Sequence, residues 1–119
     1  MGRRIIIIDD EPEILEVVRM ILEYEKFIVF PFRHAGNIFN DIVELKPDLI
    51  LLDVKLGNED GRKICAELKY NEKTKHLPVI LFSASSMLKE DIIRWGADDF
   101  INKPFDMNNL VKTVDAHLK

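Results

Sequence analysis

The chain has 119 residues, of which 47% are hydrophobic and 32% charged, and its formal net charge at pH 7 is −4. These values are typical of a single globular domain and exclude a disordered chain. The negative charge also disfavours non-specific binding to nucleic acid, which needs Lys and Arg side chains facing phosphates.

The single cysteine and the lack of long apolar runs indicate the cellular compartment. Cys65 has no partner for an internal disulfide, which fits a reducing compartment. Only four apolar residues separate Arg4 from Asp9, so no signal peptide is predicted, and no apolar run approaches the roughly 20 residues of a membrane span. We therefore expect a cytoplasmic protein that contacts neither membrane nor, directly, nucleic acid.

In the first half of the chain, apolar residues alternate between two kinds of spacing. Continuous apolar runs predict buried strands at Arg4–Ile8, Phe27–Phe30 and Leu49–Leu52. Helical spacing predicts helices over residues 14–22 and 38–45 between them, with Pro12 in the first turn of the earlier helix.

The second half continues this alternation. A third helix follows Asp60–Gly61, and the remaining expected elements are a strand at Val79–Phe82, a helix at Met87–Trp95 capped by Gly96, a strand at Phe100–Asn102 and a final helix carrying Leu110, Val111, Val114 and Leu118. Five β–α repeats with short connections predict an α/β fold: a parallel sheet covered on both faces, in a three-layer α/β/α sandwich.

Polar residues stand where four of the five predicted strands end. Asp9 and Asp10 follow the first strand, Asp53 the third, Ser83 the fourth and Lys103 the fifth. Because ligands of such sheets bind outside the carboxyl ends of the strands, we expect these side chains to meet at one edge.

Three carboxylates that lie together need a compensating cation. Oxygen ligands favour a hard ion, and Mg²⁺ typically takes one or two carboxylates while it keeps several waters. With Lys103 as a second positive charge and Ser83 as a hydroxyl donor, the group is suited to hold a phosphoryl group, and one carboxylate can itself be the nucleophile.

Four motifs carry a resemblance to a known family: IIIIDDEPE, LILLDVKLGNEDG, PVILFSAS and GADDFINKPF, in that order. Together they resemble the receiver domain of bacterial two-component response regulators (CheY-like), over essentially the whole chain. The resemblance implies a doubly wound (βα)5 sheet with the flavodoxin-like strand order 2-1-3-4-5. It also leads us to expect one receiver domain over residues 1–119, with no output domain.

The resemblance also implies the phosphorylation chemistry. Asp53 matches the phosphoacceptor, which takes a phosphoryl group from a sensor histidine kinase or a histidine phosphotransfer protein. Asp10, Asp53 and the backbone carbonyl of Lys55 match the Mg²⁺ ligands, with Asp9 acting through bound water. The domain would catalyse its own phosphorylation and dephosphorylation without being a conventional enzyme.

Further roles follow from the same resemblance. Lys103 and Ser83 would hold the phosphoryl oxygens, and Ser83 and Phe100 would move as a switch that alters binding to a downstream target, to an output domain or to a second copy in a homodimer. The bond between Lys103 and Pro104 would be cis. Gly57 stands where the family often has proline, so the loop after the third strand should be more pliable.

Several alternatives stay open at this point. The strand-end acids could be helix caps or solvated loop residues, and Phe100 could be a core aromatic. Ser85 and Ser86 compete with Ser83 for the hydroxyl role. In function, the chain could be a receiver-like interaction module that signals without phosphorylation. A haloacid dehalogenase-type phosphatase is disfavoured because Glu11 stands where that family's Asp-x-Asp motif has its second Asp.

Overall fold

The computed structural model describes residues 2–84 and 89–118, and its centre is a five-stranded parallel sheet. In space the strands follow the order β2 (Ile28–Phe32), β1 (Arg4–Ile8), β3 (Leu49–Asp53), β6 (Val79–Ser83) and β7 (Asp99–Asn102). Since β6 and β7 are the fourth and fifth strands of this sheet along the chain, the predicted order 2-1-3-4-5 is confirmed. The apolar runs of β1, β3 and β6 occupy the three central positions, where both faces are buried.

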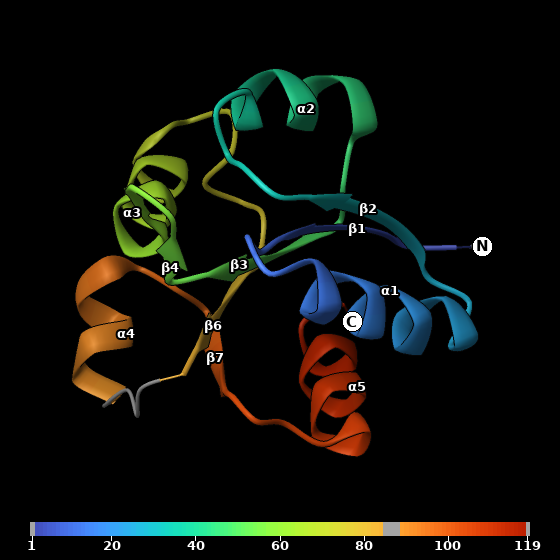
Figure 1. Cartoon of the computed structure of the whole chain (residues 1–119). Coiled ribbons are helices and arrows are strands. Elements are labelled where there is room, and N and C mark those ends of the chain that lie inside the picture. Colours follow the sequence, from blue (N-terminus) through green and yellow to red (C-terminus); the bar gives the residue numbers. More distant parts are fainter. Residues whose placement is uncertain (1, 85–88, 119) are drawn as a thin grey trace.

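Helices cover both faces of the sheet (Figure 1). On one face α1 (Pro12–Tyr24) and α5 (Met107–Ala116) pack on alternate residues of the strands, such as Ile5 and Ile7. On the other, α2 (Ile38–Leu45) and α3 (Gly61–Tyr70) pack on Ile6 and Ile8, and α4 (Lys89–Trp95) lies against α3. The predicted three-layer sandwich is thus confirmed. Within the described residues, no helix is long and apolar enough to cross a membrane.

The second strand ends later than predicted. We expected Phe27–Phe30, whereas β2 spans Ile28–Phe32 and includes Pro31. Proline lacks the N–H needed inside a sheet, but β2 is an edge strand with a partner on one side only, which tolerates it. The extension carries the chain to Arg33, beside the carboxyl end of β1.

A short hairpin, absent from the sequence prediction, follows β3. It consists of β4 (Lys55–Leu56) and β5 (Glu59–Asp60), which pair antiparallel. Its two-residue turn is Gly57–Asn58, and Gly57 has φ +59°, as the first turn residue of a type II′ hairpin requires. The sequence predicts only a pliable loop here; in the structure Gly57 has a defined place in a hydrogen-bonded turn.

The fourth helix is described from Lys89 to Trp95, and Gly96 after it has φ +80°, which fits the predicted cap. Met87 and Leu88, the start of the predicted helix, lie outside the described residues, as do Ser85 and Ser86.

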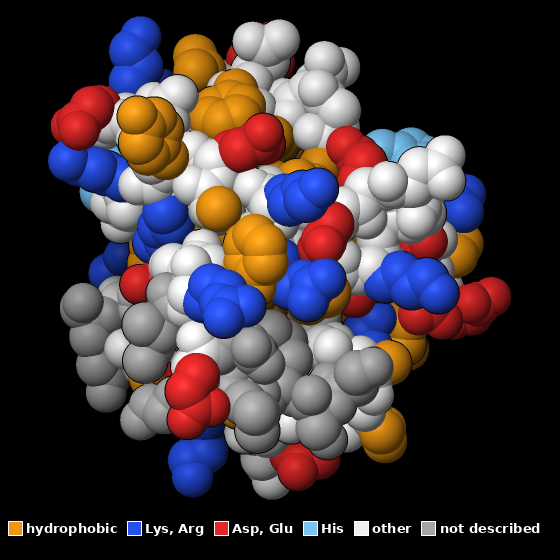
Figure 2. All heavy atoms as spheres, turned by 90° about the vertical axis from the view of Figure 1, so that its left-hand side faces the viewer, with side chains coloured by type: hydrophobic (Ala, Val, Ile, Leu, Met, Phe, Trp, Pro, Cys, Tyr) orange, Lys and Arg blue, Asp and Glu red, His pale blue; other side chains and the backbone are white. Residues whose placement is uncertain are grey.

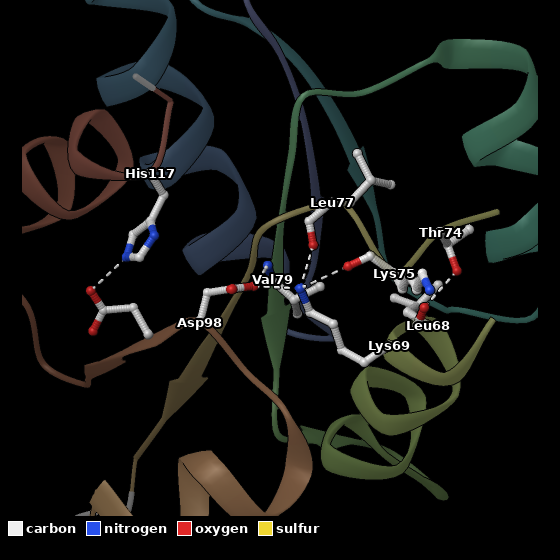
Figure 3. Close-up of polar contacts among 9 residues, drawn as sticks. Leu68, Lys69, Thr74, Lys75, Leu77, Val79, Asp98 and His117 are labelled. Carbon is white, nitrogen blue, oxygen red and sulfur yellow. Dashed lines mark hydrogen bonds and ion pairs between the residues drawn. The ribbon is translucent and has the colours of Figure 1, made fainter. Parts of the chain in front are cut away.

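The amino ends of the strands are joined by a polar network at the opposite edge of the sheet (Figure 3). The Lys69 ammonium at the end of α3 donates to the Leu77 carbonyl and to Oδ2 of Asp98, both at 2.6 Å. Asp98 Oδ2 also accepts the N–H of Val79 at 2.8 Å. On the other side of the sheet, Nε2 of His117 lies 2.9 Å from Asp99 Oδ2. These contacts join the ends of α3 and α5 to the sheet far from the strand-end acids.

Candidate functional site

The carboxyl edge of the sheet brings together the predicted side chains from separate strands. Asp9 follows β1 and is fully buried, and Asp53 closes β3 with 4% of its surface exposed. Parallel register places Asp53 opposite Phe82, so Ser83 at the end of β6 lies one residue beyond that pair. The backbone N–H of Lys103 donates to the Ser83 carbonyl at 2.7 Å, which ties the end of β7 to the end of β6.

The Lys103 ammonium lies among three carboxylates. Its Nζ is 2.8 Å from Asp9 Oδ2, 3.3 Å from Asp53 Oδ2 and 3.6 Å from Glu11 Oε1. It also lies 5.8 Å from the centre of the Phe82 ring. The peptide bond between Lys103 and Pro104 is cis. Burial alone would lower the pKa of Lys103, but its hydrogen bond to Asp9 and the charges of Asp53 and Asp9 outweigh burial and hold that pKa above its ordinary value.

Asp53 carries a buried charge that Lys103 compensates only in part. Burial first, and the neighbouring Asp9 carboxylate second, raise the pKa of Asp53 to about 6, although the Lys103 ammonium pulls it down. The Lys103 ammonium is closer to Asp9 than to Asp53, and Asp9 also accepts the Glu11 N–H at 2.9 Å. Asp53 is therefore mostly ionised at pH 7 in a place where its charge is unfavourable.

Asp10 approaches the cluster from the loop after β1 and is held by two hydrogen bonds. Its Oδ2 accepts the N–H of Gly57 at 3.1 Å, and its carbonyl accepts a hydrogen bond from the Arg33 guanidinium at 3.2 Å. The side chain is half-buried, which leaves it accessible to water and to a hydrated ion.

The geometry of the acids fits a single hard cation. One oxygen each from Asp9, Asp10 and Asp53 all lie within 4.8 Å of one another. Two oxygens on opposite sides of one Mg²⁺ are about 4 Å apart, so the cluster has nearly the size of one coordination sphere. The Lys103 ammonium offsets only one of the three carboxylates, and the excess negative charge suits a divalent ion.

Three other predicted residues lie at or near this edge. Ser83 is buried, with 5% exposed, and Phe100 is half-buried in β7, opposite Leu81 of β6. Lys55 begins β4 just beyond Asp53, with its side chain exposed. Their proposed roles, as hydroxyl donor, switch aromatic and carbonyl ligand, stay predictions.

The face of the molecule at this edge is turned to the viewer in Figure 2. Lys and Arg side chains gather around the middle of this face, with acidic side chains between them. Because Asp9 and Asp53 are buried, they contribute little to this surface. An approaching anion therefore meets mixed charge rather than a continuous acidic surface.

Four residues contribute to the site through contacts that the sequence does not predict. Glu11 completes the acids around Lys103, Arg33 and Gly57 hold Asp10, and Gly61 lies against the Asp53 backbone, where a Cβ would be 1.9 Å from the Asp53 carbonyl oxygen. One signal was present: a Gly–Asn pair between two short segments indicates a hairpin turn. No local sequence pattern around Glu11 or Arg33 predicts their contacts.

The doubly wound sheet, with an acidic cluster and a lysine at its carboxyl edge, has the features expected of a receiver domain. Comparison with known proteins gives the same family. The sequence model of the response regulator receiver domain matches residues 5–115. The chain belongs to the response regulator receiver domain family.

Solved structures with the same fold cover nearly all of the chain. A response regulator from Chloroflexus aurantiacus shares 26% identity with a TM-score of 0.92, over 99% of this chain and 98% of that one. A receiver domain of a histidine kinase from Syntrophus aciditrophicus shares 32% identity with a TM-score of 0.87, over 98% and 90%. A response regulator from Thermotoga maritima, solved in complex with Mg²⁺–BeF, shares 27% identity with a TM-score of 0.86, over 98% and 99%.

Proposed function

We propose that this domain is a phosphorylation-dependent switch of a two-component phosphorelay, in which Asp53 accepts the phosphoryl group. The observation that carries this proposal is the state of Asp53: a buried carboxylate whose pKa is raised to about 6, 3.3 Å from an ammonium and within reach of two further acids. Its charge is poorly compensated, which favours reaction with an electrophile over a purely structural role.

The transfer is a displacement at phosphorus. An Asp53 oxygen attacks the phosphorus of a phosphohistidine, the P–O bond forms as the P–N bond breaks, and the imidazole leaves with the electron pair and takes up a proton. A bound Mg²⁺ would neutralise charge on the transferring oxygens, held by Asp10, Asp53 and the Lys55 carbonyl, with Asp9 acting through water. Lys103 lies where its ammonium can hold a phosphoryl oxygen, and Ser83 lies at the adjacent strand end.

The same residues would carry the signal away from the site. The phosphoryl group adds acceptor oxygens beside Lys103 and Ser83, and a Ser83 hydroxyl drawn toward them leaves room for Phe100 to move inward. A complete shift between two conformers, from 1:99 to 99:1, takes about 5.5 kcal/mol of differential interaction. New contacts from Ser83 and Lys103 are the proposed source of that energy.

The partners follow from the chemistry of donor and output. The donor is a sensor histidine kinase or a histidine phosphotransfer protein, and the output is altered binding to a protein target, to an output domain or to a second copy of this domain. We expect the protein to act in the cytoplasm, without binding membrane or, directly, nucleic acid. Dephosphorylation would be catalysed by the domain itself.

Intact-protein mass spectrometry after incubation with acetyl phosphate tests the proposal, with and without Mg²⁺. The expected result is a Mg²⁺-dependent gain of one phosphoryl group in the wild type and none in Asp53→Ala or Asp53→Asn. A matched control is Asp115→Asn, an exposed acid on α5, which should gain the group like the wild type.

The alternative is a receiver-like module that signals by association alone. A folded wild type that binds Mg²⁺ but gains no mass would favour this alternative over phosphorylation. A gain that persists in Asp53→Asn would place the phosphoacceptor elsewhere.

A further inference from the structure

The β4–β5 hairpin makes one contact that the proposed function leaves without a role. The N–H of Gly57, at the tip of the hairpin, donates to Oδ2 of Asp10 at 3.1 Å. Proline at this position has no N–H and could not make the bond. The hydrogen bond to Asp10 therefore depends on position 57 not being proline, and in this chain it is glycine.

The hairpin is anchored at its base and through one buried side chain. The Leu56 side chain is 3% exposed and belongs to the core between the sheet and α2 and α3. The N–H of Gly61 donates to the Val54 carbonyl at 2.7 Å, and the N–H of Val54 to the Phe82 carbonyl at 2.9 Å. These contacts join the base of the hairpin to β6 and anchor Leu56, the residue before Gly57, in the core.

One amide donor leaves most of a carboxylate available. An ionised carboxylate offers about four lone-pair sites, of which the Gly57 N–H takes one. The bond restricts the rotation of a half-buried side chain that would otherwise sample several rotamers in water.

We propose that the Gly57 N–H is a positioning donor for the metal site, holding the Asp10 carboxylate toward Asp53, so that hairpin order and cation binding stabilise each other. This inference rests on the proposed function, because it takes these acids to be the Mg²⁺ ligands. By thermodynamic linkage the coupling is reciprocal. If an ordered hairpin raises the affinity for the cation by some factor, bound cation shifts the equilibrium toward the ordered hairpin by the same factor.

The sharpest test removes only the N–H. Cys65 offers a ligation junction for semisynthesis, so Gly57 can be replaced by glycolic acid, which turns the amide into an ester and keeps the turn. We expect the dissociation constant of Mg²⁺, measured by titration calorimetry at pH 7.5 and fixed ionic strength, to rise about 3- to 10-fold. The control is the semisynthetic chain with the natural amide.

Genetic variants provide a second route. Gly57→Ala keeps the N–H but strains the positive φ, whereas Gly57→Pro also removes the donor, so Pro should weaken Mg²⁺ binding more than Ala. Asn58→Ala, in the same turn, should bind Mg²⁺ as the wild type does. A second readout is hydrogen exchange of the hairpin amides, which Mg²⁺ should slow in the wild type and much less in Asp10→Asn.

The outcomes separate this inference from the proposed function. If the wild type binds Mg²⁺ and the ester variant binds it equally well or better, the positioning role is wrong while the metal site stands. If the folded wild type does not bind Mg²⁺ at all, the proposed function fails and the positioning role fails with it.

Discussion

Asp53 combines two properties that a purely structural acid would not retain: it is buried, and its best cationic neighbour lies closer to another acid. Lys103 is 2.8 Å from Asp9 but 3.3 Å from Asp53. The fold thus leaves Asp53 as a charge that is costly in the absence of a further cation. The effect of this charge on the free energy of unfolding can be measured without any phosphodonor.

Replacing Asp53 with Asn should stabilise the cation-free domain at neutral pH. Because the pKa of Asp53 is raised from 3.8 to about 6, the folded state binds its proton more tightly than the unfolded state, and stability falls as pH rises across that interval. Asn cannot ionise and escapes this loss. We expect Asp53→Asn to raise the free energy of unfolding by about 1–3 kcal/mol at pH 7.5, with the difference shrinking toward pH 4.

Urea denaturation in EDTA across this pH range is the measurement. Asp115→Asn, which removes an exposed carboxylate, should change stability by less than about 0.5 kcal/mol at every pH. A difference between wild type and Asp53→Asn that does not vary with pH would contradict the electrostatic origin.

At the scale of single residues, the sequence predicts the positions of side chains better than their contacts. Asp9, Asp10, Asp53 and Lys103 could be placed at one edge because each follows an apolar run whose end is visible in the sequence. Which acid Lys103 approaches most closely, and that Gly57 donates to Asp10, depend on side-chain directions and on a hairpin that apolar spacing does not predict. These contacts are properties of the folded structure.

At the scale of elements, the junction between β3 and α3 is closely packed beside the site. Gly61 begins α3 while its N–H donates to the Val54 carbonyl, so the helix starts directly against the strand that carries Asp53. Asp60, as the N-cap, accepts the N–H of Arg62 at 2.9 Å. The position of Asp53 is thus linked to the start of a helix.

A methyl group at position 61 should disturb this junction. In Gly61→Ala the new Cβ would lie 1.9 Å from the Asp53 carbonyl oxygen, so the backbone must shift. We expect a loss of about 1–3 kcal/mol in the free energy of unfolding and a slower gain of phosphoryl mass at Asp53. Gly36→Ala is the matched control, because a Cβ there meets no atom within 4 Å. Equal stabilities of the two variants would contradict the clash.

The network at the amino edge should matter for stability but not for the site. In Lys69→Met, the Leu77 carbonyl and the Asp98 carboxylate lose their ammonium donor, although the aliphatic stem is kept. We expect the free energy of unfolding to fall by about 1–3 kcal/mol in urea denaturation, with Mg²⁺ affinity unchanged. Lys63→Met, an exposed lysine on the same helix, is the control. A changed Mg²⁺ affinity would show that the two edges are coupled.

Element prediction succeeded where a segment is long enough to show a period. Leu49–Leu52 and Val79–Phe82 are predictable because central parallel strands are apolar on both faces. The two-residue strands β4 and β5 are too short for any period. That β2 continues through Pro31 depends on its place at the sheet edge, which is a property of the whole sheet.

For the whole molecule, cation binding and folding are linked. A cation that binds only the folded state at 100 times its dissociation constant adds about 2.7 kcal/mol to the free energy of unfolding. We expect Mg²⁺ at that level to raise the melting temperature by roughly 10 °C, measured by thermal denaturation at pH 7.5. The gain should shrink below about pH 6, where protonation of Asp53, with its pKa raised to about 6, competes with the cation.

Asp10→Asn is the critical comparison for this effect. It removes a proposed ligand from a half-buried position and should lose most of the Mg²⁺-dependent rise. An equal rise in wild type and variant would mean that Mg²⁺ acts through general screening or through another site.

The contact between Lys103 and Asp9 joins residues 94 positions apart in the chain, and this separation has a consequence for folding order. The strands that meet at the site are far apart in sequence. All neighbouring strands of the main sheet are parallel, so a crossover connection separates each strand from its partner. Contacts of such high sequence separation form late, once loop-closure entropy has been overcome. A nascent or partly unfolded chain, with β7 not yet docked, has Asp53 but not the lysine beside it. Under the proposed function, such a chain would be a poor phosphoacceptor, so the signal would come only from fully folded molecules.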